Sequence, residues 1–150
     1  TNSFLYSLAS GNYSMRGINA PIYYEMPIND KLFIAQAEII KEVAKKGSCV
    51  IVGRCADYVL DGENVDLVNV FIYGGVDYRA KRVMQALDIT QSKARDKVIK
   101  TDKQRRTYYD YYTNRDWGLM SNYDLCVNAE KFGIEGAAQL IINSVKSKLR

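Results

Sequence analysis

The chain has 150 residues, of which 47% are apolar, so it is long enough for one domain with a buried core and too short to promise two. It carries a formal charge of +4 and no histidine, which excludes Ser-His and Cys-His nucleophile pairs and leaves proton transfer to carboxylates. Its three cysteines form no CxxC pair, so they predict neither a disulfide bridge nor a metal site.

The N-terminal residues and the hydropathy favour a cytoplasmic protein without a membrane partner. The N-terminus lacks the basic flank and the small-residue cleavage site of a secretory signal. No run of about eighteen apolar residues, the length that a membrane-spanning helix needs, occurs in the sequence.

Positive charge is concentrated in one segment. Residues 77 to 106 contain ten Lys and Arg against four Asp, a net charge of +6, which leaves −2 for the rest of the chain. This local basicity predicts that an anion is handled at one place. A surface built for nucleic acid would be basic more widely, so a nucleic-acid partner is not expected.

The first third of the chain predicts one helix after a loop-rich start. Glycines and prolines scattered over residues 1 to 28 indicate loops and at most a short helix over residues 4 to 9. From residue 31 to residue 46, apolar side chains recur at intervals of three and four, which predicts an amphipathic helix. Asn29 or Asp30 is expected to cap this helix, and a glycine ends it.

Three apolar runs predict strands. Residues 49 to 52 and residues 67 to 73 look like strands buried on both faces, and residues 124 to 128 are predicted to form a third short strand. Helices are predicted over residues 77 to 87, 90 to 112 and 134 to 149, with Asp77 and Thr90 as the caps of the first two. Apolar strands that alternate with helices are typical of parallel crossovers. The predicted fold is therefore α/β, a three-layer parallel sheet covered by helices on both sides.

The first predicted strand runs directly into a Gly-Arg-x-x-Asp turn that contains Arg54 and Asp57. Ligands of parallel sheets bind at the carboxyl ends of the strands. An arginine and a carboxylate at that edge predict a site for an anionic substrate such as a nucleotide.

Six groups of residues carry a resemblance to a known family. They are Asn29-Asp-Lys-Leu-Phe, Cys49-Val-Ile-Val-Gly-Arg-Cys-Ala-Asp-Tyr-Val-Leu60, Asn69-Val-Phe-Ile-Tyr73, Arg79-x-x-Arg82, Thr101-Asp-Lys-x-x-Arg106-x-Tyr-Tyr109 and Tyr123-Asp-Leu125. In this order, over most of residues 29 to 142, the chain resembles the cytidylate kinase-like family of P-loop nucleoside monophosphate kinases.

The resemblance implies transfer of the ATP γ-phosphate to a nucleoside monophosphate, with CMP or dCMP as the favoured acceptor and Mg²⁺ bridging the phosphates. It also implies one nucleoside monophosphate kinase-like domain. Residues 1 to 48 would be its helical part that binds the monophosphate, residues 49 to 90 and 120 to 150 its core, and residues 91 to 119 its lid.

Members of the family begin with a strand and a Gly-rich phosphate loop of the G-x-x-x-x-G-K-[ST] type, which no stretch of this sequence matches. We therefore expect the first strand and the P-loop to be missing here, and hypothesise that about one βα unit precedes Thr1. The alternative is a degenerate relative that never binds ATP. A mass of 17.1 kDa for the purified protein would favour that alternative.

The resemblance assigns Arg54 to the phosphate of the acceptor, and the alternative for Arg54 is a structural ion pair with Asp57 or Asp61. Related kinases have an aspartate where this chain has Cys55, so recognition of the base does not carry over, although Asp57 is a candidate substitute. Gln36 is placed near the base, where an amide pairs with an amino-pyrimidine edge.

Arg16 falls in the insert that covers the monophosphate in the family. For Arg16 an ordinary surface loop is the stronger interpretation.

The basic segment supplies the remaining candidates. Lys103, Arg105 and Arg106 are expected to stabilise charge on the transferred phosphoryl group, and only one of the two adjacent arginines is expected to face it. Arg79 and Arg82, three apart on one helix, are candidates for the ATP phosphates or adenine; solvated surface charges are the equal alternative. Asp102 is expected to orient the arginines, to touch ribose, or to form an intrahelical pair with Arg105 or Arg106.

Aromatic side chains near the end of the basic segment are expected to pack rather than to bind a base. They are Tyr108, Tyr109, Tyr111 and Tyr112, with Trp117 as an anchor before the last strand.

Two other functions remain open from the sequence. One is a P-loop phosphotransferase with a different acceptor, because Cys55 replaces the carboxylate that is typical of the family. The other is a non-catalytic relative that binds nucleotide or RNA through the basic segment.

Overall fold

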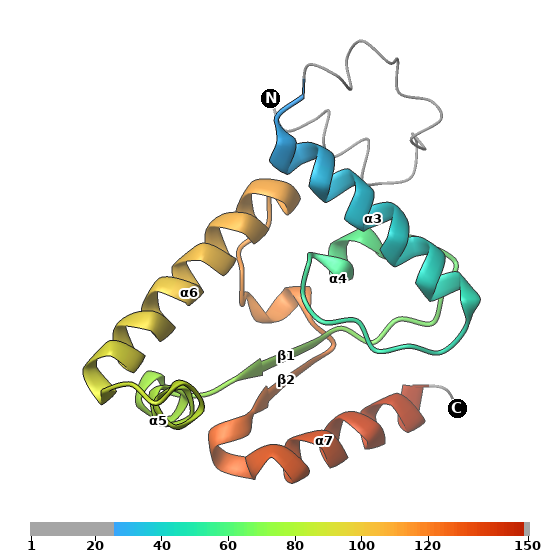
Figure 1. Cartoon of the computed structure of the whole chain (residues 1–150). Helices are drawn as coiled ribbons and strands as arrows, with labels where there is room; N and C mark the ends of the chain where they lie inside the picture. The colour runs from blue at the N-terminus through green and yellow to red at the C-terminus, as the bar shows by residue number, and fades with distance from the viewer. Residues whose placement is uncertain (1–25, 149–150) are drawn as a thin grey trace. The chain divides into compact units, whose positions relative to one another are not determined.

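The structure, a computed structural model, describes residues 26 to 148 (Figure 1). The chain divides into two compact units. The first contains the residues up to Leu67 together with Tyr111–Asn114, and the second contains Val68–Asp110 and the residues from Arg115 onward. The short helix predicted over residues 4 to 9 lies outside the described residues. In the described range, no helix is both long enough and apolar enough to cross a membrane.

The first unit is built on helix α3 (Ile28–Lys46), which confirms the predicted amphipathic helix. The predicted caps are wrong: Pro27 occupies the N-cap, and its carbonyl accepts the N–H groups of Asp30 and Lys31, each at 3.1 Å. The helix ends at Gly47, as expected. The short helix α4 (Ala56–Val59), which the sequence did not predict, packs against α3.

The core of the first unit joins the apolar stripe of α3 to the residues of α4 and its flanks. These buried side chains are Phe33, Ile34, Ala37, Ile40, Cys55, Ala56, Tyr58, Val59 and Leu60.

The strand predicted over residues 49 to 52 is wrong for the described structure. This segment has no strand assignment, and Val50 and Val52 are 93% and 88% exposed. A strand requires a partner for its backbone groups. Within residues 26 to 148 the sheet has two strands, and neither of them pairs with this segment. The apolar composition of this segment predicted a buried strand, but the described residues contain no strand that pairs with it.

The second unit contains the sheet, in which β1 (Val70–Tyr73) pairs in parallel with β2 (Leu125–Asn128). The register runs from Val70 opposite Leu125 to Tyr73 opposite Asn128. The parallel pairing confirms the α/β class, and the mixed α/β architecture has a small parallel sheet. Within residues 26 to 148 the sheet has two strands rather than the expected three. The expectation that residues 67 to 73 are buried on both faces is also wrong, because Ile72 and Tyr73 of β1 are 55% and 46% exposed.

Helices α5 (Val76–Leu87) and α6 (Gln91–Thr113) lie between the two strands in the chain, close to the predicted bounds. Small side chains, Ala80 of α5 with Ala94 and Val98 of α6, form a buried cluster that lets the helices approach closely. The hydroxyl of Thr90 accepts the N–H of Lys93 at 3.4 Å, which confirms the predicted cap. At α5 the N-cap is Gly75 rather than Asp77.

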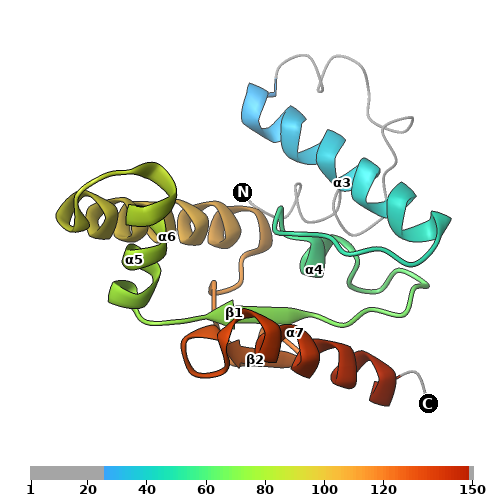
Figure 2. The same ribbon diagram turned by 60° about the horizontal axis from the view of Figure 1, so that its bottom comes forward.

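Helix α7 (Ala129–Lys148) packs along the two strands, as both ribbon views show (Figures 1 and 2). It starts earlier than predicted and is kinked at Gly133, whose φ of 67° is readily available only to glycine. The predicted start at residue 134 therefore corresponds to the helix after the kink.

Aromatic rings fix the exposed segment between α6 and β2 onto β1. The ring of Phe71 contacts the ring of Trp117 edge-on, with centroids 5.4 Å apart, and lies 4.9 Å from the ring of Tyr123. The backbone N–H of Trp117 also donates to the carboxylate of Asp110 at 2.9 Å. Trp117 is therefore the anchor that the sequence predicted.

Candidate functional site

In the first unit, the candidate substrate residues lie on a tight left-handed turn. Gly53, Arg54 and Cys55 have φ values of 70°, 58° and 55°, and the turn leads directly into α4. Left-handed φ angles cost a side-chain-bearing residue about 1 kcal/mol or more, and such strain is concentrated at functional sites. The turn therefore holds Arg54 in a conformation that its own backbone preference does not explain.

Arg54 is exposed, and within residues 26 to 148 no hydrogen bond or ion pair engages its guanidinium group. The alternative that it forms a structural ion pair with Asp57 or Asp61 is thus wrong for the described chain. A guanidinium group without a carboxylate partner is available for bidentate contact with a phosphate.

Cys55 follows Arg54 and points into the core of the unit, with 4% of its surface exposed. Burial, and then the negative charge of Asp57, raise the pKa of the Cys55 thiol to about 12, and the positive charge of Arg54 acts in the opposite direction. The side chain is therefore a neutral thiol. It cannot replace the carboxylate that related kinases carry at this position.

The other predicted substrate residues of this unit are less exposed or lie outside the described range. Asp57, in the first turn of α4, and Gln36, on α3, are partly buried, and each has an interaction with its surroundings. Arg16 lies outside the described residues. The first unit thus brings Arg54 and Asp57 together around Cys55.

In the second unit, the candidate site is at the carboxyl edge of the two strands. β1 runs through Gly74 and Gly75 into α5, and β2 runs directly into α7. The carboxylate of Glu130, in the first turn of α7, accepts the N–H of Gly75 at 2.8 Å. A Cβ at Gly75 would lie 2.8 Å from the same oxygen, so a larger residue here would force the end of the Glu130 side chain to shift.

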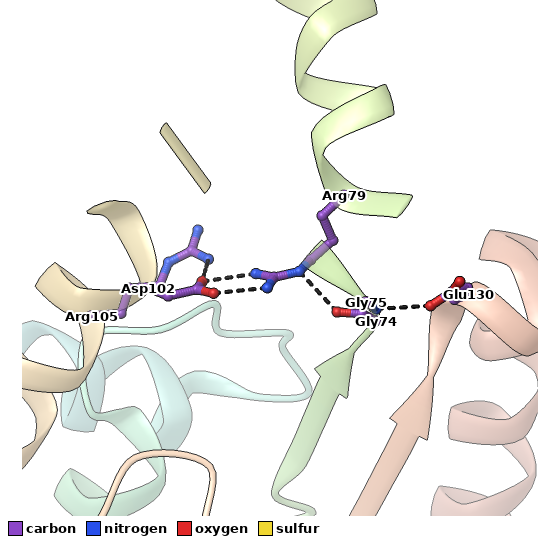
Figure 3. A network of polar contacts seen from close by, with 6 residues as sticks. All are labelled: Gly74, Gly75, Arg79, Asp102, Arg105 and Glu130. Atoms are coloured by element: carbon purple, nitrogen blue, oxygen red, sulfur yellow. Dashed lines mark hydrogen bonds and ion pairs between the residues drawn. The ribbon is translucent and has the colours of Figure 1, made fainter. Parts of the chain in front are cut away.

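Arg79 lies at the centre of a polar network at this edge (Figure 3). Its Nη1 and Nη2 contact the two carboxylate oxygens of Asp102, each at 2.8 Å, and its Nε donates to the carbonyl of Gly74 at 3.0 Å. Nη1 of Arg105 lies 3.9 Å from the same carboxylate. The carboxylate of Asp102 therefore contacts one guanidinium group from α5 and one from α6.

The remaining predicted cations are exposed and stand apart from this network. Lys103 and Arg106 on α6 and Arg82 on α5 form no ion pair or hydrogen bond with any other described residue. The two adjacent arginines differ in their contacts: Nη1 of Arg105 lies 3.9 Å from the carboxylate of Asp102, whereas Arg106 forms no ion pair with it. The second unit thus brings Arg79 and Arg105 together and leaves Lys103, Arg106 and Arg82 in solvent.

The main partner of Asp102 was not predicted from the sequence. The intrahelical contact with Arg105, present at 3.9 Å, was expected, but the two-point contact with Arg79 was not. The role of Glu130 was not predicted either. A signal existed for Glu130, because it lies two residues beyond the end of a parallel strand, and the neighbouring strand is followed by two glycines.

Two of the four tyrosines of α6 pack into the protein, as the sequence predicted for this aromatic cluster. Tyr109 and Tyr112 are buried, each 5% exposed, while Tyr111 is 48% exposed. In the first unit, the ring of Tyr112 stacks on that of Phe33 with centroids 4.1 Å apart.

Comparison with curated proteins identifies three archaeal relatives, each named cytidylate kinase. The protein of Methanocaldococcus jannaschii is 27% identical over 69% of this chain and 59% of its own length. That of Pyrococcus horikoshii is 31% identical over 67% of this chain and 50% of its own length. The protein of Staphylothermus marinus is 24% identical over 73% of this chain and 60% of its own length. The chain thus spans about half to three fifths of the length of these relatives.

A solved structure also resembles the chain. The crystal structure of an uncharacterized protein from Eubacterium ventriosum matches with a TM-score of 0.76 and 29% identity. The match covers 97% of this chain and 81% of that one.

The match to a family is more extensive than that to any of the three kinases. The family model described as the cytidylate kinase-like family matches residues 1–131, which is most of the sequence. The matched range includes the Arg54 turn and the basic helix α6. The chain belongs to the cytidylate kinase-like family.

Proposed function

We propose that the protein transfers the γ-phosphoryl group of ATP to a nucleoside monophosphate, with CMP or dCMP as the favoured acceptor. The proposal includes a P-loop nucleoside monophosphate kinase fold. It is supported by membership of the cytidylate kinase-like family and by the parallel strands whose carboxyl ends lead into helices. The observation that carries it is Arg54, an exposed guanidinium group on a strained turn without a partner among the described residues.

In this proposal Arg54 binds the phosphate of the acceptor. A planar guanidinium forms two parallel hydrogen bonds with phosphate oxygens, which fixes the acceptor in both position and direction. Positioning is a large part of phosphoryl-transfer catalysis, because little covalent chemistry is required of the protein. Asp57 and Gln36, from the same unit, are the candidates for contact with the nucleoside.

The cations of the second unit serve the phosphoryl donor. In this proposal Lys103, Arg105 and Arg106 stabilise the negative charge of the transferred group, and Arg79 and Arg82 bind the phosphates or the adenine of ATP. The two exposed cations Lys103 and Arg106 have no competing carboxylate among the described residues, so they are available without rearrangement.

Magnesium enters the proposal as the Mg–ATP substrate complex. Mg²⁺ retains several of its waters and is commonly held by substrate phosphates and one or two carboxylates. Over residues 26 to 148 there is no group of three carboxylate or thiol side chains able to hold a metal ion. In this proposal the phosphates of ATP and water supply most of the ligands of Mg²⁺.

A second acceptor class is supported by Cys55. A buried, neutral thiol at this position cannot accept hydrogen bonds as a carboxylate does, so discrimination of cytosine must come from other groups. A phosphotransferase of the same family with a different acceptor is the alternative function.

A coupled ATP-consumption assay of the full-length gene product tests the proposal. CMP, dCMP, UMP and AMP are offered in turn with Mg–ATP, and ATP consumption is compared with and without each monophosphate. Acceptor-dependent ATP consumption that is highest with CMP or dCMP supports the proposal. A different preferred acceptor supports the alternative, and ATP consumption that no monophosphate stimulates excludes both.

A further inference from the structure

Asp102 occupies an unusual position for a carboxylate in a basic segment. It receives both terminal nitrogens of Arg79 from α5, and Arg105 of its own helix approaches the same group. Because Nε of Arg79 donates to the carbonyl of Gly74, all three nitrogens of that guanidinium group are engaged. The cation that the sequence assigns to ATP is therefore already bound to an anion of the protein.

The geometry of this contact is that of an anion-binding site. A bidentate guanidinium and a second arginine, beside the glycines at the carboxyl end of a parallel strand, form the arrangement that binds phosphate oxygens in α/β proteins. The two oxygens of Asp102 occupy the places where phosphate oxygens would bind Arg79 and Arg105. We propose that Asp102 is an internal substitute for a phosphate, which the phosphates of ATP must displace to reach these two arginines.

The network is open enough for exchange. The side chains of Arg79 and Asp102 are 30% and 25% exposed, and that of Arg105 is 61% exposed. Ion pairs accessible to solvent are weak, since water and salt compete for both partners. A nucleoside triphosphate carries several negative charges against the single charge of Asp102, so it competes effectively for a segment with an excess of Lys and Arg.

The pair is not needed to hold α5 against α6. Asp77 of α5 and Arg95 of α6 form a second ion pair between the same helices. The buried cluster of Ala80, Ala94 and Val98 adds an apolar contact between them. Loss of the contact between Asp102 and Arg79 therefore leaves the helix pair in place, and Arg79 is free to change partner.

The inference rests on the proposed function, because it concerns the ATP subsite of that function, and it predicts the effect of removing the competing charge. Asp102→Asn keeps the shape of the side chain but weakens its hold on both guanidinium groups. We expect Mg–ATP to bind this variant about two- to five-fold more tightly, which is the range set by a solvent-accessible ion pair.

Isothermal titration of the full-length protein with Mg–ATP measures this effect. Asp77→Asn is the matched control, because it removes one Asp charge and one ion pair between the same helices but leaves Arg79 and Arg105 untouched. Arg79→Gln tests whether the gain operates through Arg79: combined with Asp102→Asn it should abolish most of the tightening. An Asp102→Asn variant that binds Mg–ATP no more tightly than Asp77→Asn overturns the proposal.

A measurement on the unmodified protein covers the case in which Asp102→Asn is unstable. The Nε–H resonance of Arg79, assigned with Arg79→Lys, is followed by NMR while inorganic tripolyphosphate and then Mg–ATP are added. Exchange of partner predicts a saturable shift of this resonance, and no shift at saturating nucleotide contradicts it.

The two proposals fail in different ways. Tighter Mg–ATP binding by Asp102→Asn without any phosphoryl transfer refutes the kinase function and retains the phosphate substitute. If the protein transfers phosphate to CMP but Asp102→Asn binds Mg–ATP with unchanged affinity, the kinase function is supported and the phosphate substitute is refuted. If neither the wild-type protein nor Asp102→Asn binds Mg–ATP or tripolyphosphate, the substitute is refuted, whatever the origin of the activity.

Discussion

The phenol of Tyr112 donates a hydrogen bond of 2.9 Å to the carboxylate of Asp30, although the two residues are 82 positions apart. Asp30 belongs to the first turn of α3 and Tyr112 to the last turn of α6, and both side chains are buried. The ring of Tyr112 also stacks on that of Phe33, which is one turn along α3 from Asp30. The first unit is therefore held together by a polar and an apolar contact from a single side chain.

Tyr112→Phe should destabilise the protein by about 1–3 kcal/mol, because it keeps the stacked ring but removes the donor to a buried carboxylate. Urea denaturation measures the change in the free energy of unfolding. Tyr111→Phe is the matched control, since Tyr111 is the neighbouring and exposed tyrosine. Equal stability of the two variants would contradict a structural role for the hydrogen bond.

Local sequence signals predicted the helices well. The three- and four-residue spacing of apolar side chains in α3 and the Thr90 cap of α6 are properties of consecutive residues, and the structure reproduces both. The parallel pairing of β1 with β2 also followed from the apolar runs and the helices between them. The helix spacing and the cap depend on residues that lie close together in the chain, whereas the strand pairing follows from the order of the elements.

The strand over residues 49 to 52 and the Arg79 network could not be predicted in the same way. A strand exists only beside another strand, and no described strand pairs with Val50 or Val52. The contact between Arg79 and Asp102 was not predicted because the two residues are 23 positions apart. Several other Lys and Arg residues lie nearer to Asp102 in the sequence. The type and location of the candidate residues were predictable, but their pairing was not.

Arg54→Gly should abolish most phosphoryl transfer while leaving stability unchanged or raising it by up to about 1 kcal/mol. Glycine adopts the φ of 58° at this position without strain, and the lost guanidinium group has no described partner. We expect kcat/KM for the acceptor to fall at least about a hundredfold. Steady-state kinetics and thermal denaturation test the two parts.

Lys46→Ala is the control for Arg54→Gly, because Lys46 is an exposed cation in the last turn of α3, in the same unit as Arg54. Its kinetics should match those of the wild-type protein. A loss of stability in Arg54→Gly that parallels the loss of activity would assign Arg54 a structural role.

Arg106→Ala should lower turnover far more than it lowers stability. Arg106 is exposed on α6 and forms no hydrogen bond or ion pair with any other described residue, so its removal should change the free energy of unfolding by less than about 0.5 kcal/mol. A cation that stabilises charge in the transition state contributes about a hundredfold or more to kcat. Lys97→Ala, an exposed cation earlier on the same helix, is the control. Equal kcat values for the two variants would remove Arg106 from the site.

Cys55 should resist alkylation in the folded protein, while Cys49 should react. The thiolate is the reactive species, and burial together with the charge of Asp57 raises the pKa of Cys55 to about 12, whereas Cys49 is exposed. Brief treatment with iodoacetamide at about pH 8, followed by peptide mass analysis, reads each cysteine separately. Labelling of Cys55 should appear only after denaturation. Equal labelling rates for Cys55 and Cys49 in the native protein would contradict the buried placement.

Asp124 should make the stability of the second unit sensitive to acid. The N–H of Asn69 donates a hydrogen bond of 2.7 Å to the carboxylate of Asp124. This hydrogen bond is the main reason why the pKa of Asp124 lies below its ordinary value of 3.8. Burial raises the pKa, and the contact with Lys148 lowers it further. A lowered pKa means that the folded state binds the proton more weakly than the unfolded state. The stability that this contributes is complete above pH 3.8 and is lost as the pH falls through the lowered value.

Asp124→Asn tests this directly, because asparagine retains an acceptor for the N–H of Asn69 but has no charge to titrate. Urea denaturation of both proteins at about pH 6 and about pH 3 gives two differences in the free energy of unfolding. The wild-type protein should be the more stable at the higher pH, and its advantage should shrink at the lower pH, because protonation of Asp124 weakens its contacts with both Asn69 and Lys148. An advantage that is the same at both pH values would show that the contacts of Asp124 do not depend on its charge.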